Sequence, residues 1–158
     1  MPGRRSDLGG RVTTTGASIH ELVEHRLRQS DLRYTTGRRA IVELLRRRGQ
    51  PASIADVEAA LPQVPRSSAY RHLVDLQGVG VVRRVAANDD FTRFELAEDL
   101  TEHHHHLLCT SCGGVTDVTP TEAFEHAVHT MVEEFSRQEG FTPVSHSLDV
   151  LGHCKRCG

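Results

Sequence analysis

The sequence predicts an α+β protein of two small domains, the first mainly helical and the second a mixture of strand and helix. Its 158 residues allow one ordinary domain or two small ones, each with a modest core that benefits from a metal or a partner subunit. Apolar spacing typical of helices gives way to β-rich runs near residue 79, and a strand, helix, strand pattern follows residue 97. Charge divides in a similar way: residues 26–84 have a net charge of +7 from 12 Lys or Arg and 5 Asp or Glu, whereas residues 99–158 have −6 from 3 and 9.

These observations suggest three segments along the chain. Residues 1–17 are rich in Gly, Thr and Arg without periodicity, so we expect a flexible arm there. We expect the first domain over residues 18–97 and the second over 98–158. A basic half beside an acidic half suits a protein that reads a polyanion and also binds cations.

Four helices are expected in the first domain. Ser18 and Glu21 have capping-box spacing, and the apolar stripe behind them predicts a helix to about residue 30. Further helices are expected over about 36–48, 53–61 and 66–77, ended by Gly49, Pro62 and Gly78. Two β-rich runs over 79–85 and 91–96, joined by turn-forming residues, predict a hairpin. Short helices followed by a hairpin are the order of a winged helix-turn-helix domain.

The clearest element of the second domain is a long helix. Thr119, Pro120 and Glu122 are interpreted as its N-cap, first-turn proline and capping-box acid, and Gly140 as its end. A last strand is expected over about 144–151. The domain is therefore predicted to be a small α/β unit.

A winged helix-turn-helix domain meets double-stranded DNA with the N-terminal part of its recognition helix. The stretch 65–71 places hydroxyl groups and long basic side chains there, and more basic residues lie near the start of the second helix. The candidate DNA contacts are Arg66, Ser67, Ser68, Tyr70, Arg71, Arg33, Arg38 and Arg39. Residues 46–48, all arginine, are interpreted as a solvated basic face.

Two CxxC pairs, Cys109 with Cys112 and Cys154 with Cys157, bracket the second domain. Two such pairs can complete a tetrahedral, four-thiolate structural Zn²⁺ site. The sequence therefore predicts that the second domain contains zinc knuckles. A redox dithiol or two disulfides are alternatives, but neither explains why matching pairs bracket one domain. With no apolar run of membrane-spanning length and no secretory signal, we expect a cytoplasmic protein without a membrane partner.

Four consecutive histidines, residues 103–106, precede the first CxxC pair. If this segment is extended, His103 and His105 lie on one face and His104 and His106 on the other, so one strand supplies two ligands to each of two sites. The run is internal and lies inside a patterned segment, which argues against a purification tag.

The other ligands of these sites must come from elsewhere in the chain. Alternation along residues 91–96 points Glu95 away from the hairpin core. In the long helix Glu125 is the better candidate because Glu122 serves as a cap, and His146 lies in the expected last strand. The remaining candidates, His20, His25, His72, His126 and His153, are interpreted as structural.

The sequence offers no motif for an enzyme. His20 and His25 are five residues apart, where a metalloprotease helix needs four, and the zinc deaminase pairing is not found. A zinc hydrolase is therefore the weaker alternative to a DNA-binding protein.

Taken together, these motifs resemble the ferric uptake regulator family of bacterial metal-dependent repressors, over residues 18–157. Residues 68–73 (SAYRHL) are similar to the family's T-V-Y-R-x-L recognition helix. Residues 93–96 (RFEL), 103–113 (HHHHLLCTSCG), 145–148 (SHSL) and 152–157 (GHCKRC) carry the rest of the resemblance.

The resemblance implies a homodimer, with a higher oligomer as an option, that represses transcription by binding palindromic operator DNA when loaded with metal. The cysteine-bound Zn²⁺ would hold the dimerisation domain together. A regulatory metal would use Glu95, His104 and His106, and an additional site would use His103, His105, Glu125 and His146. Because these donors are nitrogen and oxygen, Fe²⁺ or Zn²⁺ is expected at the regulatory site, with Mn²⁺ as a further option.

The chain departs from the family in one ligand. Many members supply a further regulatory histidine ahead of the third helix, where this sequence has Gln50, Pro51 and Ala52. The options for the fourth ligand are Asp89, Asp90, Asp99, an N-terminal histidine or water. The long helix is about one turn longer than in familiar members, and no cysteine is left for the regulatory site. A peroxide- or manganese-responsive regulator of the same family is the alternative function.

Overall fold

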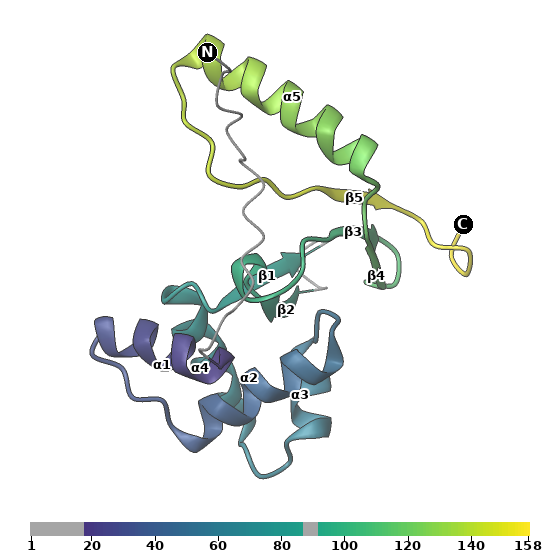
Figure 1. The fold of residues 1–158 in the computed structure, drawn as a ribbon. Helices are drawn as coiled ribbons and strands as arrows, with labels where there is room; N and C mark the ends of the chain where they lie inside the picture. Colours follow the sequence, from purple (N-terminus) through teal and green to yellow (C-terminus); the bar gives the residue numbers. More distant parts are fainter. Residues whose placement is uncertain (1–17, 87–91) are drawn as a thin grey trace.

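The computed structural model describes residues 18–86 and 92–158. The expected arm over residues 1–17 and the ligand options Asp89 and Asp90 lie outside these residues. In the first half, α1 (Ile19–Gln29), α2 (Thr36–Arg48), α3 (Ile54–Ala60) and α4 (Arg66–Gly78) are followed by the antiparallel strands β1 (Val82–Ala86) and β2 (Thr92–Leu96) (Figure 1). Within the described residues, this order is that of a winged helix-turn-helix.

Local capping explains where these helices begin and end. The backbone N–H of Ser18 donates to Glu21 at 2.7 Å, so the predicted capping box is present, and that of Ser53 donates to Asp56 at 2.8 Å in a second one. Gly49 ends α2 with φ of 62°, a left-handed conformation that favours glycine.

The four helices and the hairpin share one apolar core. Its largest fully buried members come from α1, α2, α3 and α4: Val23, Leu27, Ile41, Val42, Val57, Leu73 and Leu76. The polar side chain of Arg38 is also buried, where it pairs with Asp75 of α4 and donates to the backbone carbonyl of Arg33. Arg38 therefore fastens α2 to α4 inside this unit.

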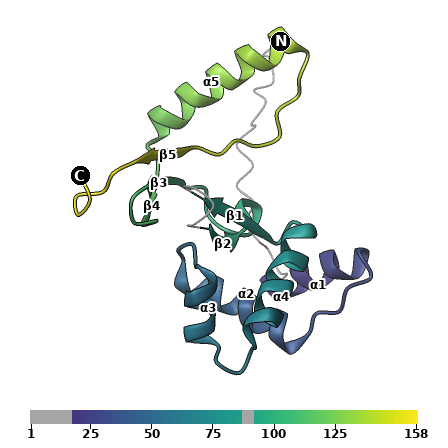
Figure 2. The same cartoon turned by 180° about the vertical axis from the view of Figure 1, so that it is seen from behind.

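The second half contains a sheet and one long helix. A 3₁₀ turn (Glu98–Leu100) leads to β3 (His105–Cys109), β4 (Val115–Val118), α5 (Glu122–Glu139) and β5 (Asp149–Gly152) (Figure 2). In the sheet β3 is central, antiparallel to β4 and parallel to β5. His106 is the register partner of Asp117 on β4 and of Asp149 on β5, so the three residues form one row across the sheet.

Two predictions for this half need correction. The N-cap of α5 is Thr121, whose Oγ1 accepts from the N–H of Phe124 at 3.3 Å, so Glu122 is the first helical residue and not a capping-box acid. Strand β5 begins only at Asp149, and His146, three residues earlier, is therefore not on a strand.

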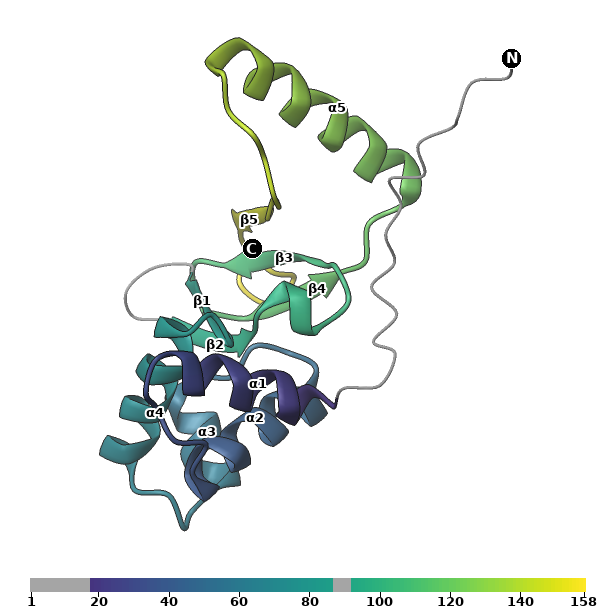
Figure 3. The same cartoon turned by 60° about the vertical axis from the view of Figure 1, so that its left-hand side comes forward.

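The long helix and the edge strand leave apolar surface uncovered. In Figure 3, α5 stands away from the helical unit and the sheet. Phe135 is 62% exposed and Met131 49%, and Val150 and Leu151 of β5 are also exposed. Among the described residues, no helix is long and apolar enough to cross a membrane. A single chain thus presents an apolar face that nothing in the described structure covers.

Candidate metal centres

Three groups of metal-binding side chains converge among the described residues, each with its ligand atoms within 4.8 Å of one another. The cysteine cluster is Cys109, Cys112, Cys154 and Cys157; the sensor cluster is Glu95, His104 and His106; and the histidine cluster is His103, His105, Glu125 and His146. These are the sets expected from the sequence. That each set holds a metal ion stays a prediction.

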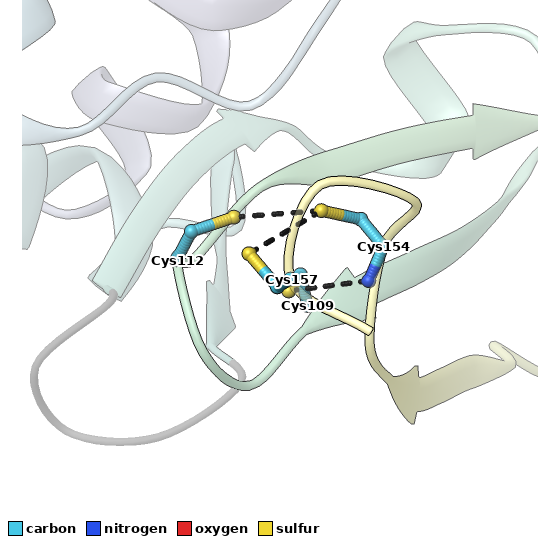
Figure 4. A group of neighbouring side chains, drawn as sticks. All are labelled: Cys109, Cys112, Cys154 and Cys157. Carbon is cyan, nitrogen blue, oxygen red and sulfur yellow. Dashed lines mark hydrogen bonds between the residues drawn. The ribbon is translucent and has the colours of Figure 1, made fainter.

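The cysteine cluster forms where β3 and β5 end (Figure 4). The Sγ atom of Cys154 lies 3.8 Å from that of Cys112 and 3.6 Å from that of Cys157. Thiolates around a tetrahedral Zn²⁺ with bonds of about 2.3 Å lie about 3.8 Å apart, so these separations suit zinc. All four cysteines are in the described part of the chain, and none of them forms a disulfide.

Backbone hydrogen bonds favour the thiolate form at two of the four cysteines, whereas the hydrogen bond with Cys154 is the main reason that the pKa of Cys157 rises to about 12. The backbone N–H of Cys154 donates to Sγ of Cys109 at 3.4 Å, and this bond is the main reason that the pKa of Cys109 falls to about 5. The pKa of Cys154 is also lowered, first by the backbone N–H of Arg156. Zinc binds cysteine as thiolate, so the donor set fits the metal.

The sensor cluster lies between the hairpin and the sheet. Glu95 is on β2, His106 is on β3, and His104 immediately precedes β3. The Oε2 atom of Glu95 lies 3.1 Å from Nε2 of His106 and 3.3 Å from Nε2 of His104. The side chain of His106 is fully buried and that of Glu95 is 8% exposed.

The Nδ1 atoms of His104 and His106, which point away from Glu95, show why a cation fits this cluster. Nδ1 of His104 donates to the carbonyl of Glu102 at 2.8 Å, and Nδ1 of His106 lies 2.9 Å from the carboxylate of Asp149. With each Nδ1 facing an acceptor, each Nε2 is directed at the same carboxylate oxygen of Glu95. A proton on Nε2 or a bound cation can join each ring to this oxygen, and three donors converging on one point fit a divalent metal.

Arg83 is the neighbour of the sensor cluster on the hairpin. It is the register partner of Glu95, and its Nε donates to Glu95 Oε1. Burial by itself raises the pKa of Glu95, but the hydrogen bond from His106 and the nearby positive charges, including Arg83, outweigh burial and lower it. Glu95 is therefore held as a carboxylate.

Sequence reasoning missed Asp117 of β4. Its Oδ1 is buried without a hydrogen bond and lies 3.8 Å from Nε2 of His106, and burial raises the pKa of this carboxyl group. The register of β4 against β3 brings it there, so pairing the two strands around the first CxxC turn could have found it. Asp117 is a fourth donor, and a second carboxylate, beside the sensor cluster.

Other options for the fourth ligand point elsewhere. Asp99 pairs with Arg26, His20 contacts the hydroxyl of Tyr34 at 2.6 Å, and His25 contacts Gln29 at 3.1 Å. In the described structure these three side chains have other partners and do not join the sensor cluster.

Glu125 is the centre of the histidine cluster. Its Oε1 lies 2.8 Å from Nε2 of His105, and its Oε2 lies 3.3 Å from Nε2 of both His103 and His146. The Nε2 atoms of His103 and His146 are buried and have no hydrogen-bond partner. A further carboxylate, Glu98, lies 2.9 Å from Nδ1 of His103. Buried ring nitrogens around one carboxylate fit a second nitrogen and oxygen site.

The candidate DNA contacts separate into exposed and buried residues. On α4, Arg66, Ser67, Tyr70 and Arg71 are exposed, with Tyr70 at 57%, and Ser68 is half-buried. Arg66 pairs with Glu58 of α3. Arg33 is exposed, and Arg39 is exposed over the ring of Tyr34.

Arg38 does not fit a role in binding DNA. Its side chain is only 10% exposed and is held by Asp75. We therefore assign it to the packing of α2 on α4.

A family model described as the ferric uptake regulator family matches residues 29–151. The peroxide-responsive repressor PerR of Staphylococcus aureus is 28% identical over 145 residues, covering 87% of this chain and 92% of the relative. The ferric uptake regulator of Pseudomonas aeruginosa, solved with manganese, matches at 26% identity and a TM-score of 0.65, covering 83% and 96% of the two chains. The Helicobacter pylori regulator, described with three functional metal binding sites, matches in fold at 23% identity and a TM-score of 0.69, covering 88% and 91%.

Proposed function

The chain belongs to the ferric uptake regulator family and is a metal-responsive transcriptional regulator, not an enzyme, and on that premise we propose that the sensor cluster controls its binding to operator DNA. The observation that carries this proposal is the meeting of Glu95 on the hairpin with His104 and His106 from the second half, at 3.3 and 3.1 Å. Because β1 follows α4 after a short connection, the position of the hairpin affects that of the recognition helix.

The sensor residues link two parts of the chain. Glu95 is carried by the hairpin, whereas both imidazoles are carried by the segment that leads into β3. A bound divalent cation supplies the positive charge that these three donors lack among themselves. When a cation holds the three donors together, the orientation of the hairpin and α4 relative to the second half is fixed. In a dimer this also fixes the spacing of the two recognition helices.

Asp117 supports a fourth ligand from the second half in place of the histidine that is missing ahead of α3. Its buried, unpaired Oδ1 makes it the described residue that best completes the set. Two imidazoles and two carboxylates suit Fe²⁺, Zn²⁺ and Mn²⁺, and we propose Fe²⁺ as the regulatory ion. The cysteine cluster is assigned to structural Zn²⁺ and the histidine cluster to an additional metal.

The exposed apolar face supports a homodimer. Phe124, Met131 and Phe135 of α5 are exposed, and β5 is one of the two edge strands of its sheet. An unpaired edge and an apolar helix face of this kind are covered when two copies associate. We assign dimerisation to α5 and β5.

Binding of the protein to DNA from its own promoter tests this function. Zinc-loaded protein is titrated against that duplex and against a scrambled one, with Fe²⁺ under anaerobic conditions and with a chelator too weak to strip the cysteine cluster. We expect tighter binding to the promoter DNA with Fe²⁺, weakened steeply by salt. Equal affinity with Fe²⁺ and with chelator contradicts the proposal.

A peroxide-responsive regulator is the second candidate, favoured by the similarity to PerR of Staphylococcus aureus. The imidazoles of His104 and His106 are the oxidisable groups closest to the proposed iron. Mass spectrometry of the iron form after peroxide treatment separates the two. Addition of one oxygen to either histidine, with release from DNA, supports peroxide sensing, and unmodified histidines support metal sensing alone.

A further inference from the structure

Asp149 is the first residue of β5, and its Oδ1 lies 2.9 Å from Nδ1 of His106. The two residues are register partners on neighbouring parallel strands, so the pairing of β3 with β5 fixes the contact. The side chain of His106 is fully buried, whereas that of Asp149 is 38% exposed. The contact therefore lies at the outer side of the sensor cluster, behind the ring.

The two ring nitrogens of His106 face different surroundings. Nε2 points to Glu95 at 3.1 Å and to Asp117 at 3.8 Å, which is the centre of the sensor cluster. Nδ1 has two polar neighbours with opposite requirements. The carboxylate of Asp149 can only accept a hydrogen bond, and the guanidinium of Arg83, 3.4 Å away, can only donate one.

Each neighbour selects a different tautomer of the neutral ring. A hydrogen bond to Asp149 needs the proton on Nδ1 and leaves the lone pair of Nε2 free for a cation. A hydrogen bond from Arg83 needs the lone pair on Nδ1 and places the proton on Nε2, where it blocks metal binding. The Asp149 contact, at 2.9 Å, is shorter than that of Arg83 with Nδ1 (3.4 Å) and than that of Glu95 with Nε2 (3.1 Å), so the neutral ring keeps its proton on Nδ1.

The other sensor imidazole, His104, has the same arrangement, and within the described part of the chain no donor competes for its Nδ1. Nδ1 of His104 donates to the carbonyl of Glu102 at 2.8 Å, and its Nε2 faces Glu95. His106 cannot use a backbone carbonyl in this way, because it lies within β3 and its neighbours' carbonyls belong to the sheet. A side-chain acceptor is needed, and β5 supplies it.

We propose that Asp149 is a positioning residue that holds His106 in the tautomer whose Nε2 can bind a divalent cation in the sensor cluster. The proposal rests on the proposed function, since it takes that cluster as the sensor. It also gives the edge strand β5 a part in sensing, because a change in the pairing of β5 moves the acceptor of His106.

The tautomer can be observed without any metal in the sensor cluster. Protein with ¹⁵N-labelled histidine and zinc only in the cysteine cluster is studied by NMR, at a pH where the ¹⁵N shifts themselves show the ring of His106 to be neutral. We expect wild-type His106 to carry its proton on Nδ1. Asp149→Asn keeps an oxygen acceptor and should retain this tautomer, whereas Asp149→Leu should move the proton to Nε2. A wild-type ring with its proton on Nε2 overturns the proposal without any variant.

Affinity for Mn²⁺ alone, measured from the paramagnetic resonance of the free ion, gives the second readout. Loss of a residue that orients a ligand typically lowers metal affinity about 10–100-fold, and we expect this for Asp149→Leu, with Asp149→Asn nearer to wild type. Asp99→Leu is the matched control, because Asp99 pairs with Arg26 and should leave affinity unchanged. Zinc content and circular dichroism verify that each variant is folded.

The outcomes separate this proposal from the proposed function. If Asp149→Leu binds Mn²⁺ as wild type does, while His104→Ala/His106→Ala loses it, the tautomer proposal is wrong and the sensor assignment stands. If the double histidine variant also binds Mn²⁺ normally at this site, the sensor assignment itself is wrong.

Discussion

Nε2 of His106 and Oε2 of Glu95 lie 3.1 Å apart, although one belongs to the sheet of the second half and the other to the hairpin behind the recognition helix. The side chains of both residues are almost fully buried. Among the described residues, this pair is the shortest contact between the sensor imidazoles and the hairpin, and the proposed dependence of DNA binding on metal binding rests on it.

Glu95→Gln tests the carboxylate of this pair. We expect Mn²⁺ affinity at the sensor cluster to fall at least about tenfold, equivalent to about 1.4 kcal/mol, because an anionic donor is replaced by a neutral one. Zinc in the cysteine cluster should be unaffected. Glu134→Gln, on the exposed surface of α5, is the control, and an unchanged Mn²⁺ affinity in Glu95→Gln would exclude Glu95 as a ligand.

Asp117→Asn should separate metal affinity from stability. The buried Oδ1 of Asp117 has no hydrogen bond, so removing its charge should leave the free energy of unfolding of metal-free protein equal or higher, while Mn²⁺ affinity falls. Asp56→Asn is the opposite case, since Asp56 caps α3 and pairs with Arg93. It should lower the free energy of unfolding by about 0.5–2 kcal/mol without changing metal affinity. Urea titrations and Mn²⁺ binding measure both quantities.

Arg38 and Arg71 should respond differently to substitution. Arg38→Met leaves Asp75 unpaired beside the core, and we expect the free energy of unfolding to fall by about 2–3 kcal/mol, less than for a fully buried pair because Asp75 is partly exposed. Arg71→Met should leave the free energy of unfolding nearly unchanged but weaken operator binding. The slope of the logarithm of the binding constant against the logarithm of salt concentration should become shallower by about one. A stable Arg38→Met variant with weaker DNA binding would restore Arg38 to the DNA-contacting set.

Alkaline pH tests the packing of Tyr34. Burial is the main reason that its pKa rises from 10.0 to about 12, and its hydroxyl contacts His20 at 2.6 Å. A group whose pKa is raised by folding stabilises the fold fully below its unfolded pKa, and this contribution is lost as pH rises from about 10 to 12. The free energy of unfolding of wild type should therefore fall more steeply over this range than that of Tyr34→Phe. Parallel curves for the two proteins would show that Tyr34 is not buried in this way.

Local patterns were sufficient for the helical unit. The capping boxes at Ser18 and Ser53 and the glycine at position 49 mark helix ends through contacts between near neighbours in the chain. Alternation along the four histidines likewise separated His104 and His106 from His103 and His105, because side chains in an extended segment alternate between two faces.

Contacts between distant segments were not predictable in the same way. Asp117 and Asp149 reach His106 only through the register of β3 with β4 and β5, and β5 follows β4 after the whole of α5. His146 reaches its cluster from the segment before β5, where the sequence indicated a strand. From the sequence, Arg38 is interpreted as a phosphate contact. Its partner Asp75 lies on another helix, 37 residues along the chain, so the sequence alone does not show that Arg38 is paired and buried.

The most direct test of the central claim is operator binding by His104→Ala/His106→Ala, compared with His25→Ala/His129→Ala. The control pair is exposed, lies outside the three clusters and removes the same two imidazoles. Both variants are verified as folded and loaded with zinc in the cysteine cluster, and their affinity for promoter DNA is measured with Fe²⁺ and with chelator. We predict that the control gains affinity with Fe²⁺, as wild type does, and that the sensor variant does not. An equal gain in affinity by the sensor variant would contradict the account.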